Sequence, residues 1–320
     1  MTAPARPRPE VHGVLNLFKP AGMTSHDVVD AVRKILGIRR VGHTGTLDPQ
    51  ATGVLPVCVG RATRVAQYLT QADKEYVMTL RLGVTTDTLD AAGKETGRAE
   101  AGHVTREDLL AVLPRFRGEI QQVPPIYSAK KVQGERLYRL ARRGQTVERP
   151  PVAVRVHVLE LLDFRAPLAT LKAVCSKGTY ARSLCDDIGR ALGCGGHLQD
   201  LVRTRAGRFA LEDAVTLPAL EERVATGRLG EVLQPMGEAL AHLPAIRVAP
   251  EAGPLILHGR TVPASLLVGV PEEAARGGVV RVLGFRKQLL ALAELLLGRE
   301  ELAGGDAGRP ALRAIRVFGG

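Results

Sequence analysis

Short apolar runs alternate with glycine- and proline-containing turns along most of the chain, a pattern typical of mixed strands and helices. Apolar residues at helical spacing follow Thr24, whose pairing with Asp27 forms a capping box. The same reasoning predicts helices at 24–37, 62–69, 105–113 and 183–193. Strands are expected at 13–18, 54–60, 75–82, 152–164, 168–176 and 197–209, and the fourth and fifth of these should pair. This order of elements indicates an α/β (α+β) fold.

The two ends of the chain differ from the rest in composition and in hydrophobic pattern. Residues 1–10 contain three prolines and two arginines and are predicted to be a disordered tail. Residues 218–237 read as irregularly helical, and from about Ala245 short strand-like runs at 279–283, 289–292 and 314–318 are separated by glycine and proline. We therefore expect a main domain over residues 11–244 and a small β-rich second domain over residues 245–320.

The loop at residues 42–53, Gly-His-Thr-Gly-Thr-Leu-Asp-Pro-Gln-Ala-Thr-Gly, is too rich in glycine to be a helix or an interior strand. It holds one carboxylate, Asp48, and one imidazole, His43, and its nearest charged neighbours are all arginines (Arg39, Arg40, Arg61, Arg64). A lone acid in a rigid cationic loop can be desolvated and still ionised, as an aspartate nucleophile requires. Asp48 could instead hydrogen-bond its own turn, and these residues alone leave both interpretations open.

The net charge narrows the class of partner. The 320 residues carry a formal charge of +11 and give a pI of about 9.9, which points to a polyanion, most simply nucleic acid. The excess is concentrated in residues 31–64, 129–150 and 171–208. A uniformly basic surface would also produce this total, so the nucleic-acid interpretation requires that folding brings these stretches together.

Four other charged residues have two interpretations each. Arg182 lies near a predicted helix start, where a cation opposes the helix dipole, so either an anion such as Asp48 compensates it or its side chain faces solvent. Lys19 is either a phosphate contact or a solvated turn residue, and its spacing favours the latter. Asp87 and Asp90 could bind a metal, but no third ligand is nearby, which favours turn chemistry.

Residues 124–128 begin with Pro-Pro and are predicted to be stiff and extended. A basic helix follows, with positive charges at Arg136, Arg139, Arg142 and Arg143. It could close over a bound strand or be a solvated helix face. Four of the five tyrosines lie in these predicted strand, arm, helix and turn segments: Tyr76, Tyr127, Tyr138 and Tyr180. Such rings could hold an unstacked base, although tyrosine in a strand also serves ordinary packing.

Several classes are excluded by what the sequence lacks. The four cysteines show no C-x-x-C spacing, so we expect reduced thiols, of which Cys58 and Cys175 should be buried, and no zinc. No phosphate-binding loop, metalloprotease, hydrolase or calcium-loop motif is present, so no cofactor and no metal are expected. There is no signal-peptide h-region and no membrane-spanning run, which favours the cytoplasm. No coiled-coil pattern is seen, so a monomer is expected.

Four motifs together resemble the bacterial TruB family of tRNA pseudouridine synthases. They are Lys19-Pro20 with Gly22-Met23-Thr24-Ser25, the loop 42–53, Val-Pro-Pro-Ile-Tyr-Ser-Ala at 123–129, and Cys-Ser-Lys-Gly-Thr-Tyr-Ala-Arg at 175–182. The resemblance covers about residues 11–210 and implies a catalytic domain with a mixed, mainly antiparallel sheet flanked by helices. It implies isomerisation of uridine 55 in the T loop of tRNA. The C-terminal part resembles the PUA RNA-binding domain that follows the catalytic domain in this family.

The resemblance also implies roles for individual residues. Asp48 matches the catalytic aspartate, and Arg182 matches the arginine that pairs with it. The substrate-binding positions that match the family are Lys19, His43, Tyr76, Tyr180, Arg182 and Leu201. Among them His43 matches the residue that helps to extrude the uridine, and Tyr76 the ring that stacks on it. Residues 124–148 match a mobile thumb, and Asp90 resembles a family residue near the site.

The implied reaction breaks the N1–C1′ bond, rotates the uracil and rejoins it through C5, without a cofactor. Whether Asp48 attacks C1′, attacks C6 or assists a proton shift at C2′ is left open. Two further functions stay open: a guide-RNA-dependent pseudouridine synthase of the dyskerin type, and an RNA-binding or tRNA-folding protein. The thumb-like segment and the lack of long basic tails favour a stand-alone enzyme that acts on the tRNA T arm with no obligatory protein partner.

Overall fold

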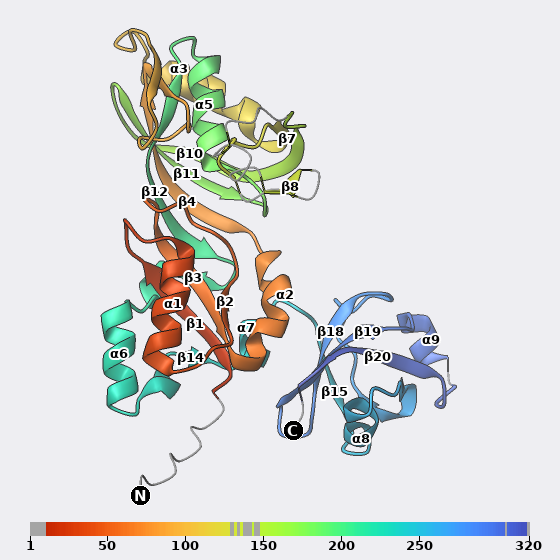
Figure 1. Cartoon of the computed structure of the whole chain (residues 1–320). Helices are drawn as coiled ribbons and strands as arrows, with labels where there is room; N and C mark the ends of the chain where they lie inside the picture. The colour runs from red at the N-terminus through yellow and green to blue at the C-terminus, as the bar shows by residue number, and fades with distance from the viewer. Residues whose placement is uncertain are drawn as a thin grey trace, which may run out of the picture.

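The structure is a computed structural model that describes residues 11–128, 131–132, 135–136, 143, 148–304 and 306–318. The predicted tail at 1–10 lies outside these residues, as does much of the thumb-like segment at 124–148. Figure 1 shows a main part with two lobes, one above the other, and a smaller part beside the lower lobe.

A ten-stranded sheet runs through both lobes of the main part. Its order is β14-β1-β3-β12-β4-β11-β10-β7, with β2 on β3 and β13 on β12. The strands are β1 (Gly13–Lys19), β2 (Val41–His43), β3 (Thr52–Val59), β4 (Lys74–Leu82), β7 (Gly118–Gln122), β10 (Val152–Arg165), β11 (Leu168–Cys175), β12 (Gly196–Ala206), β13 (Phe209–Ala210) and β14 (Leu233–Gln234). Among these strands only β3 and β12 pair in parallel. The expected mixed, mainly antiparallel sheet is confirmed.

Helices cover the sheet at each lobe. In the lower lobe α1 (Ser25–Leu36) and α6 (Leu217–Ala225) pack with β1 and β3 around one apolar cluster. In the upper lobe α3 (Arg106–Val112) and α5 (Ala181–Ala191) pack on β4, β10 and β11 around a second cluster. The long strands β4 and β12 join the two lobes (Figure 1). The remaining short elements of the main part are η1 (Gly60–Val65), α2 (Ala66–Thr70), β5 (Val84–Thr86), β6 (Glu95–Arg98), η2 (Leu113–Phe116), η3 (Leu211–Asp213), η4 (Leu229–Glu231) and α7 (Met236–Ala239).

Local sequence signals explain how α1 begins and ends. The Thr24 hydroxyl accepts a hydrogen bond from the Asp27 amide, and the Asp27 carboxylate accepts one from the Thr24 amide. Gly37 ends the helix in the left-handed region at φ +65°, which a glycine adopts without steric cost. The predicted capped helix is confirmed, and its ends fix the turn that precedes the 42–53 loop.

A second, six-stranded sheet contains the C-terminal residues, in the order β16-β20-β19-β18-β15-β17. Its elements are β15 (Ala245–Val248), α8 (Ala252–Leu257), β16 (Val262–Pro263), η5 (Ala264–Leu266), β17 (Leu267–Val268), β18 (Val279–Leu283), β19 (Leu289–Leu295), α9 (Arg299–Ala303) and β20 (Pro310–Val317). Leu292 and Phe318 from this part share an apolar cluster with Val65 and Leu240 of the main part. The two sheets therefore belong to one packed unit.

Two expectations about local structure are wrong. The helix predicted at 62–69 is a 3₁₀ turn, η1, followed by only five α-helical residues in α2. The turn expected around Asp87 and Asp90 is present at residues 87–89, directly after β5, which pairs with β6. Arg136 was expected in a basic helix, but β8 (Lys131–Val132) and β9 (Glu135–Arg136) form a two-stranded ladder. The neighbouring residues 137–142 lie outside the described part of the chain.

Charge and burial bear on two other expectations. All four cysteines are free and buried, as expected for reduced thiols.

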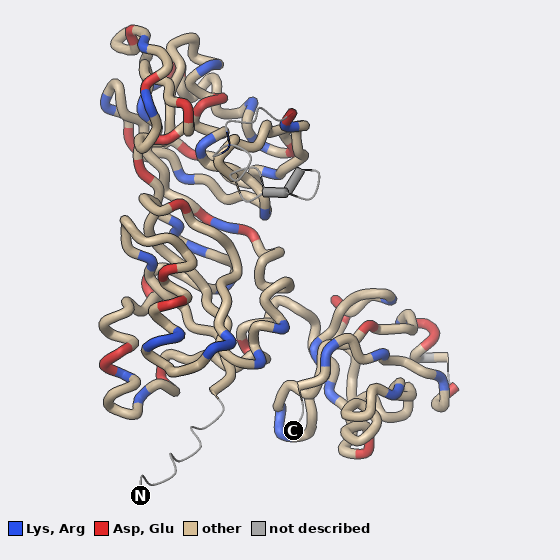
Figure 2. Tube along the Cα trace, in the orientation of Figure 1, with Lys and Arg blue, Asp and Glu red and all other residues tan. Residues whose placement is uncertain are grey.

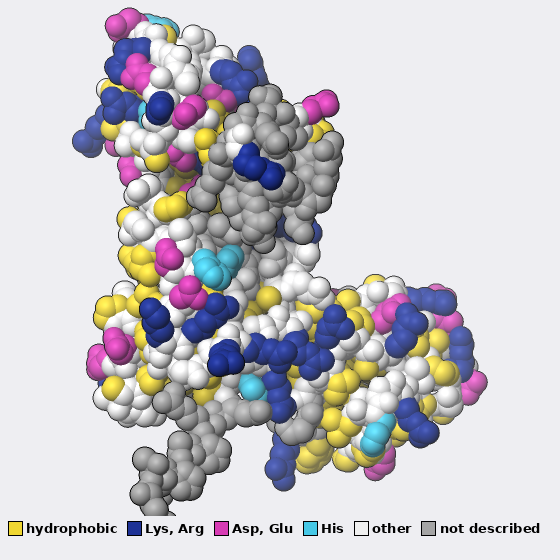
Figure 3. Space-filling view, in the orientation of Figure 1, with side chains coloured by type: hydrophobic (Ala, Val, Ile, Leu, Met, Phe, Trp, Pro, Cys, Tyr) yellow, Lys and Arg dark blue, Asp and Glu magenta, His cyan; other side chains and the backbone are white. Residues whose placement is uncertain are grey.

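Figure 2 shows Lys and Arg interleaved with Asp and Glu over the main part, so positive and negative side chains are not separated along the chain. Figure 3 shows where the basic side chains gather: a nearly continuous row of Lys and Arg crosses from the lower lobe to the C-terminal part. Among the described helices, none is long and apolar enough to cross a membrane.

Candidate active site

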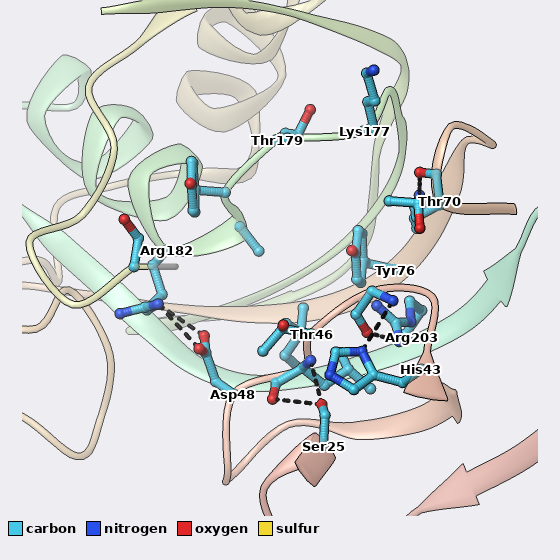
Figure 4. A pocket seen from close by; sticks show the side chains of 18 of the residues that line it. Ser25, His43, Thr46, Asp48, Thr70, Tyr76, Lys177, Thr179, Arg182 and Arg203 are labelled. Carbon is cyan, nitrogen blue, oxygen red and sulfur yellow. Dashed lines mark hydrogen bonds and ion pairs between the residues drawn. The ribbon is translucent and has the colours of Figure 1, made fainter. Parts of the chain in front are cut away.

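A cleft of about 870 Å³ lies between the two lobes, where β4 and β12 pass from one lobe to the other. Its lining comes from the 42–53 loop, from β4 and β12, and from the turn that leads into α5. Figure 4 shows Asp48 and Arg182 facing each other, with His43, Tyr76 and Arg203 grouped beside them. The cleft is lined by six of the predicted site residues: His43, Asp48, Tyr76, Tyr180, Arg182 and Leu201. Lys19 and Asp90 are not in its lining.

Asp48 and Arg182 form a side-on ion pair. The Arg182 Nε lies 2.9 Å from one carboxylate oxygen of Asp48, and its Nη2 donates to the other at 3.1 Å. Only 7% of the Arg182 side chain is exposed, against 39% for Asp48, so the carboxylate is the open end of the pair. The Asp48 turn itself is closed by its backbone, because the Ala51 amide donates to the Asp48 carbonyl at 3.1 Å.

Two opposing effects set the ionisation of Asp48. Burial raises the pKa of the Asp48 carboxyl above its ordinary value, and the nearby charge of Asp90 raises it further. The guanidinium of Arg182 opposes both through its charge and its hydrogen bond. A carboxylate held in this way is poorly solvated and fixed in direction, which are the properties of a reactive group in a cleft.

Arg182 is itself held by partners other than Asp48. Its Nη2 donates to the Tyr127 carbonyl at 3.0 Å, its Nη1 donates to the Thr88 carbonyl at 3.4 Å, and Nη1 lies 3.7 Å from an Asp90 carboxylate oxygen. The Arg182 side chain therefore faces inward, and the solvent-facing interpretation is wrong. Its guanidinium joins the 42–53 loop to the segments around Thr88 and Tyr127.

The Asp90 side chain accepts hydrogen bonds within its own turn, in addition to its contact with Arg182. One of its carboxylate oxygens accepts from the Thr88 hydroxyl at 2.6 Å and from the Ala92 amide at 3.1 Å. Leu89 between them has φ +63°, a region that costs a non-glycine residue free energy and is often retained at functional sites. In the described chain, no group of three or more His, Cys, Asp or Glu could hold a metal.

Three buried polar side chains hold the backbone of the 42–53 loop. The Lys19 Nζ donates to the carbonyls of Pro20, Met23 and Pro49 at 2.8, 2.6 and 3.0 Å. Ser25 accepts from the Leu47 amide at 2.8 Å, and the Arg203 Nη2 donates to the Gly45 carbonyl at 3.1 Å. The expectation that Lys19 is a solvated turn residue is wrong, since its exposed fraction is 0%.

Tyr76 lies on the floor of the cleft against a buried cation. Burial raises the pKa of the Tyr76 phenol, and the positive charge of Arg203 opposes the rise. Arg203 is 1% exposed, and its Nε donates to the Val54 carbonyl at 2.7 Å. Lys74 lies close by and donates to the carbonyls of Thr70 and Ala72, and burial together with Arg203 lowers the pKa of its ammonium to about 8.

The other two predicted aromatic and imidazole side chains are anchored through the backbone. His43 Nδ1 accepts from the Gly45 amide at 3.3 Å, and burial lowers the pKa of the imidazole, which favours its neutral form. The backbone of Tyr180 is held by the fully buried Gln122, whose side chain accepts from the Tyr180 amide at 3.0 Å and donates to its carbonyl at 3.3 Å.

Four residues that shape the site were not predicted by sequence reasoning: Ser25, Lys74, Gln122 and Arg203. The sequence signals for Ser25 and Lys74 are weak: Ser25 ends the Gly-Met-Thr-Ser motif at 22–25, and Lys74 lies two residues before Tyr76. Gln122 and Arg203 lie in strands, where nothing in the sequence pattern distinguishes an inward polar side chain from an outward one. Their role becomes visible only from their burial and their hydrogen bonds.

Comparison with solved structures defines the class. A structure described as an H/ACA RNP bound to a substrate RNA containing 2′-deoxyuridine has 30% sequence identity and a TM-score of 0.78, over 96% of this chain and 85% of that one. A Cbf5-Nop10-Gar1 complex has 31% identity and a TM-score of 0.78, over 96% and 85% of the two chains. The chain has the fold of the pseudouridine synthases of this type.

Sequence comparison narrows the class to a family. Residues 33–181 match the TruB family pseudouridylate synthase N-terminal domain, and residues 182–241 match the tRNA pseudouridylate synthase B C-terminal domain. Proteins named tRNA pseudouridine synthase B are 53% identical in Symbiobacterium thermophilum, over 78% of this chain and 83% of that protein, and 45% identical in Stutzerimonas stutzeri, over 91% and 93%. The chain belongs to the TruB family of pseudouridylate synthases. The family resemblance and the isomerase class predicted from the motifs are thereby confirmed.

Proposed function

We propose that this enzyme isomerises uridine 55 in the T loop of tRNA, with Asp48 as the catalytic residue. The observation that carries the proposal is the pairing of Asp48 with a nearly buried Arg182 in the lining of a cleft. Relatives that are 45–53% identical are named for tRNA, which supports this substrate class. The number 55 follows from the motif resemblance.

The reaction needs the uridine to leave its stack before the glycosidic bond can be reached. The cleft offers an aromatic ring, Tyr76, and an apolar side chain, Leu201, between which an extruded uracil would lie. His43, whose neutral form is favoured by burial, packs against neighbouring bases, and Tyr180 forms a second aromatic wall. These four residues together hold the base while it is detached from the sugar.

Asp48 acts on the nucleoside while the N1–C1′ bond breaks. The uracil then turns so that C5 faces C1′, the C5–C1′ bond forms, the C5 proton leaves and N1 takes up a proton, so that no atoms are gained or lost. Arg182 holds the Asp48 carboxylate in its ionised form as bound RNA expels water from the cleft. In this proposal Tyr76 lies nearest to the C5 proton when that proton leaves, and because burial raises the pKa of its phenol, the proton passes to another acceptor such as water.

Lys19 and Asp90 act on the site indirectly in this proposal. The Lys19 Nζ is fully used by three carbonyls, including that of Pro49 beside the catalytic aspartate, so it positions the loop instead of binding a phosphate. Asp90 contacts the outer face of the Arg182 guanidinium and fixes its direction. Both therefore set where Asp48 points.

The C-terminal sheet, over residues 245–320, is proposed to be a PUA-like RNA-binding domain that follows a catalytic domain at 11–244. The row of basic side chains that crosses from one to the other supports a single RNA ligand that spans both (Figure 3). We place the enzyme in the cytoplasm as a monomer that needs neither a cofactor nor a protein partner.

The guide-RNA-dependent alternative rests on the fold alone. The structures of that type are 30–31% identical to this chain, whereas full-length relatives at 45% identity carry the tRNA synthase name. An RNA-binding or tRNA-folding role is compatible with the enzyme, since opening and closing the T loop could assist folding.

Position-resolved mapping of pseudouridine tests the proposal. Purified enzyme is incubated with an unmodified full-length tRNA transcript, and the product is mapped by carbodiimide labelling and primer extension. We expect one modified uridine, at position 55, and none in a transcript with cytidine there. Modification at other uridines in that variant transcript, or a requirement for an added guide RNA, would contradict the proposal.

A further inference from the structure

The hairpin between β18 and β19 exposes an aromatic ring at its tip. Phe285 is 83% exposed, whereas the other exposed large hydrophobic residues of the described chain reach only 38–51%. A partly exposed apolar residue is ordinary on a protein surface, but a phenylalanine with most of its surface in water is not. The chain has only six phenylalanines and no tryptophan, so this one stands out.

The tip is a rigid turn. The Lys287 amide donates to the Gly284 carbonyl at 2.9 Å, and the Gly284 amide donates to the Gln288 carbonyl at 3.0 Å. Lys287 has φ +60°, a region that few non-glycine residues adopt. The ring is therefore held out by a fixed backbone, which lowers the entropy cost of binding through it.

The charge beside the ring is purely positive. No Asp or Glu occurs between Glu273 and Glu294 in the sequence. The two other cations of this stretch are occupied, Arg276 by Glu301 and Arg281 by the carbonyls of Leu243 and Gly237. Arg286 and Lys287, next to Phe285, are both exposed. Neither of them makes an ion pair or side-chain hydrogen bond with any part of the chain that the structure describes.

We infer that residues 285–287 form a second RNA contact, in which the Phe285 ring stacks on an unpaired base and Arg286 and Lys287 bind the adjacent phosphates. An aromatic ring with flanking cations is the chemistry that binds single-stranded nucleic acid without reading its sequence. Figure 3 shows basic side chains along the edge of the C-terminal part as well as at the junction, which favours RNA over an apolar protein partner. The inference rests on the proposed function and places this contact outside the T arm of the same tRNA.

Because the chain has no tryptophan, Phe285→Trp installs a single fluorescent reporter at the tip. A base that stacks on the indole should quench its emission. We expect saturable quenching when a full-length tRNA transcript is titrated in, and none with an isolated T-arm stem-loop. The matched control is Leu257→Trp, on α8 in the same sheet domain and 50% exposed, which should show no saturable quenching.

Alanine variants measure how much these side chains contribute to the affinity for tRNA. Phe285→Ala should raise the Kd for full-length tRNA by roughly five- to a hundredfold, the range for loss of one stacked base. Arg286→Ala should reduce the salt dependence of binding by about one released counterion. Neither should change the rate on the T-arm stem-loop, and both should fold normally because these side chains are exposed.

An unchanged Kd together with no quenching would overturn the inference, and so would equal quenching by the stem-loop, which would put the contact within the T arm. Quenching by added protein in place of RNA would also overturn it. If the wild-type enzyme fails to modify the stem-loop at all, the proposed function fails, whereas the fluorescence titration still reports on the tip.

Discussion

At the scale of single residues, the proposed chemistry depends on a carboxylate that is difficult to ionise and on a cation that keeps it ionised. Burial raises the pKa of Asp48, and Arg182 lowers it again through two contacts at 2.9 and 3.1 Å. The arginine can do this because backbone carbonyls and Asp90 fix its far side. The pH dependence of the reaction should therefore report on Arg182 as well as on Asp48.

Arg182→Gln should move the acid limb of the pH–rate profile. In the proposed mechanism the ionised form of Asp48 is the active form, so activity should be lost as the pH falls through its pKa. Without the guanidinium, burial is no longer opposed and the pKa of Asp48 rises further. We expect the acid limb of kcat/KM to move to higher pH, with a loss of rate of about tenfold or more. Arg190→Gln, on the exposed side of the same helix, should leave the profile unchanged, and an unmoved limb in Arg182→Gln would refute this coupling.

Lys19→Met should destabilise the fold. The substitution leaves the carbonyls of Pro20, Met23 and Pro49 without their buried donor, which should lower the free energy of unfolding by roughly 2–4 kcal/mol in a urea titration. Lys34→Met, on the exposed face of α1, should change it by less than about 0.5 kcal/mol. A Lys19→Met protein of normal stability that binds RNA weakly would instead indicate a phosphate contact.

At the scale of elements, the parallel pair β3–β12 sets the position of the site. The 42–53 loop enters β3 at Thr52, and β12 places Arg203 beside Gly53. The pairing of β3 with β12 therefore fixes the position of the loop relative to the Arg203 side chain. Gly53 has φ +106°, and a Cβ there would lie 2.2 Å from the Arg203 carbonyl. Only glycine allows the two strands to approach this closely.

Gly53→Ala should therefore separate β3 from β12. We expect a loss of roughly 2–4 kcal/mol in the free energy of unfolding, from the left-handed backbone and the clash together, measured by urea titration. Gly42→Ala in β2 is the control, because a Cβ added at Gly42 would have nothing within 4 Å and the change should stay near zero. Equal stabilities for the two variants would show that the close approach is not needed.

The positions of helices and strands could be predicted from the sequence better than the order in which the strands pair. The start and end of α1 are encoded by Thr24, Asp27 and Gly37, which act on their own backbone neighbours. The order of strands depends on contacts between residues far apart, such as Gly53 with Arg203, which no local pattern contains. The error at 62–69 has the same origin, because packing against the C-terminal part replaces intrinsic helix preference in η1.

Some residues of the site could likewise be predicted from the sequence, and others could not. Asp48 could be singled out because a lone acid among glycines and arginines is unusual, and Arg182 because a cation at a helix start needs compensation. Lys19 was misjudged because a lysine beside a proline turn is normally solvated, and only the fold shows three carbonyls converging on it. Arg203 gave no signal at all, since its role depends on the strand opposite.

At the scale of the whole molecule, the junction between the two sheets orders the surface that would bind RNA. The guanidinium of Arg64 lies 5.4 Å from the centroid of the Phe318 ring and donates to the Val317 carbonyl at 2.8 Å. Arg281 donates to the Leu243 carbonyl at 2.9 Å from the other side. These contacts and the shared apolar cluster fix the basic row that crosses the junction (Figure 3).

The two parts should consequently unfold together. We expect a single calorimetric transition for the wild-type protein, because separation would expose the shared cluster to water. Phe318→Ala removes a 6%-exposed ring from that cluster and should separate the transition into two or lower the main Tm by several degrees. Two separate transitions in the wild-type protein would show that the parts are independent.

We propose that the Asp48–Arg182 cleft isomerises uridine without any other component. Tritium release from C5 of uridine in a T-arm stem-loop tests this, with purified protein and no cofactor, metal or partner added. We expect release of about one equivalent by the wild-type protein, and a rate at least about a hundredfold lower for an Asp48→Asn protein that still binds the RNA. Full activity in Asp48→Asn, or no release by a wild-type protein that binds the stem-loop, would contradict it.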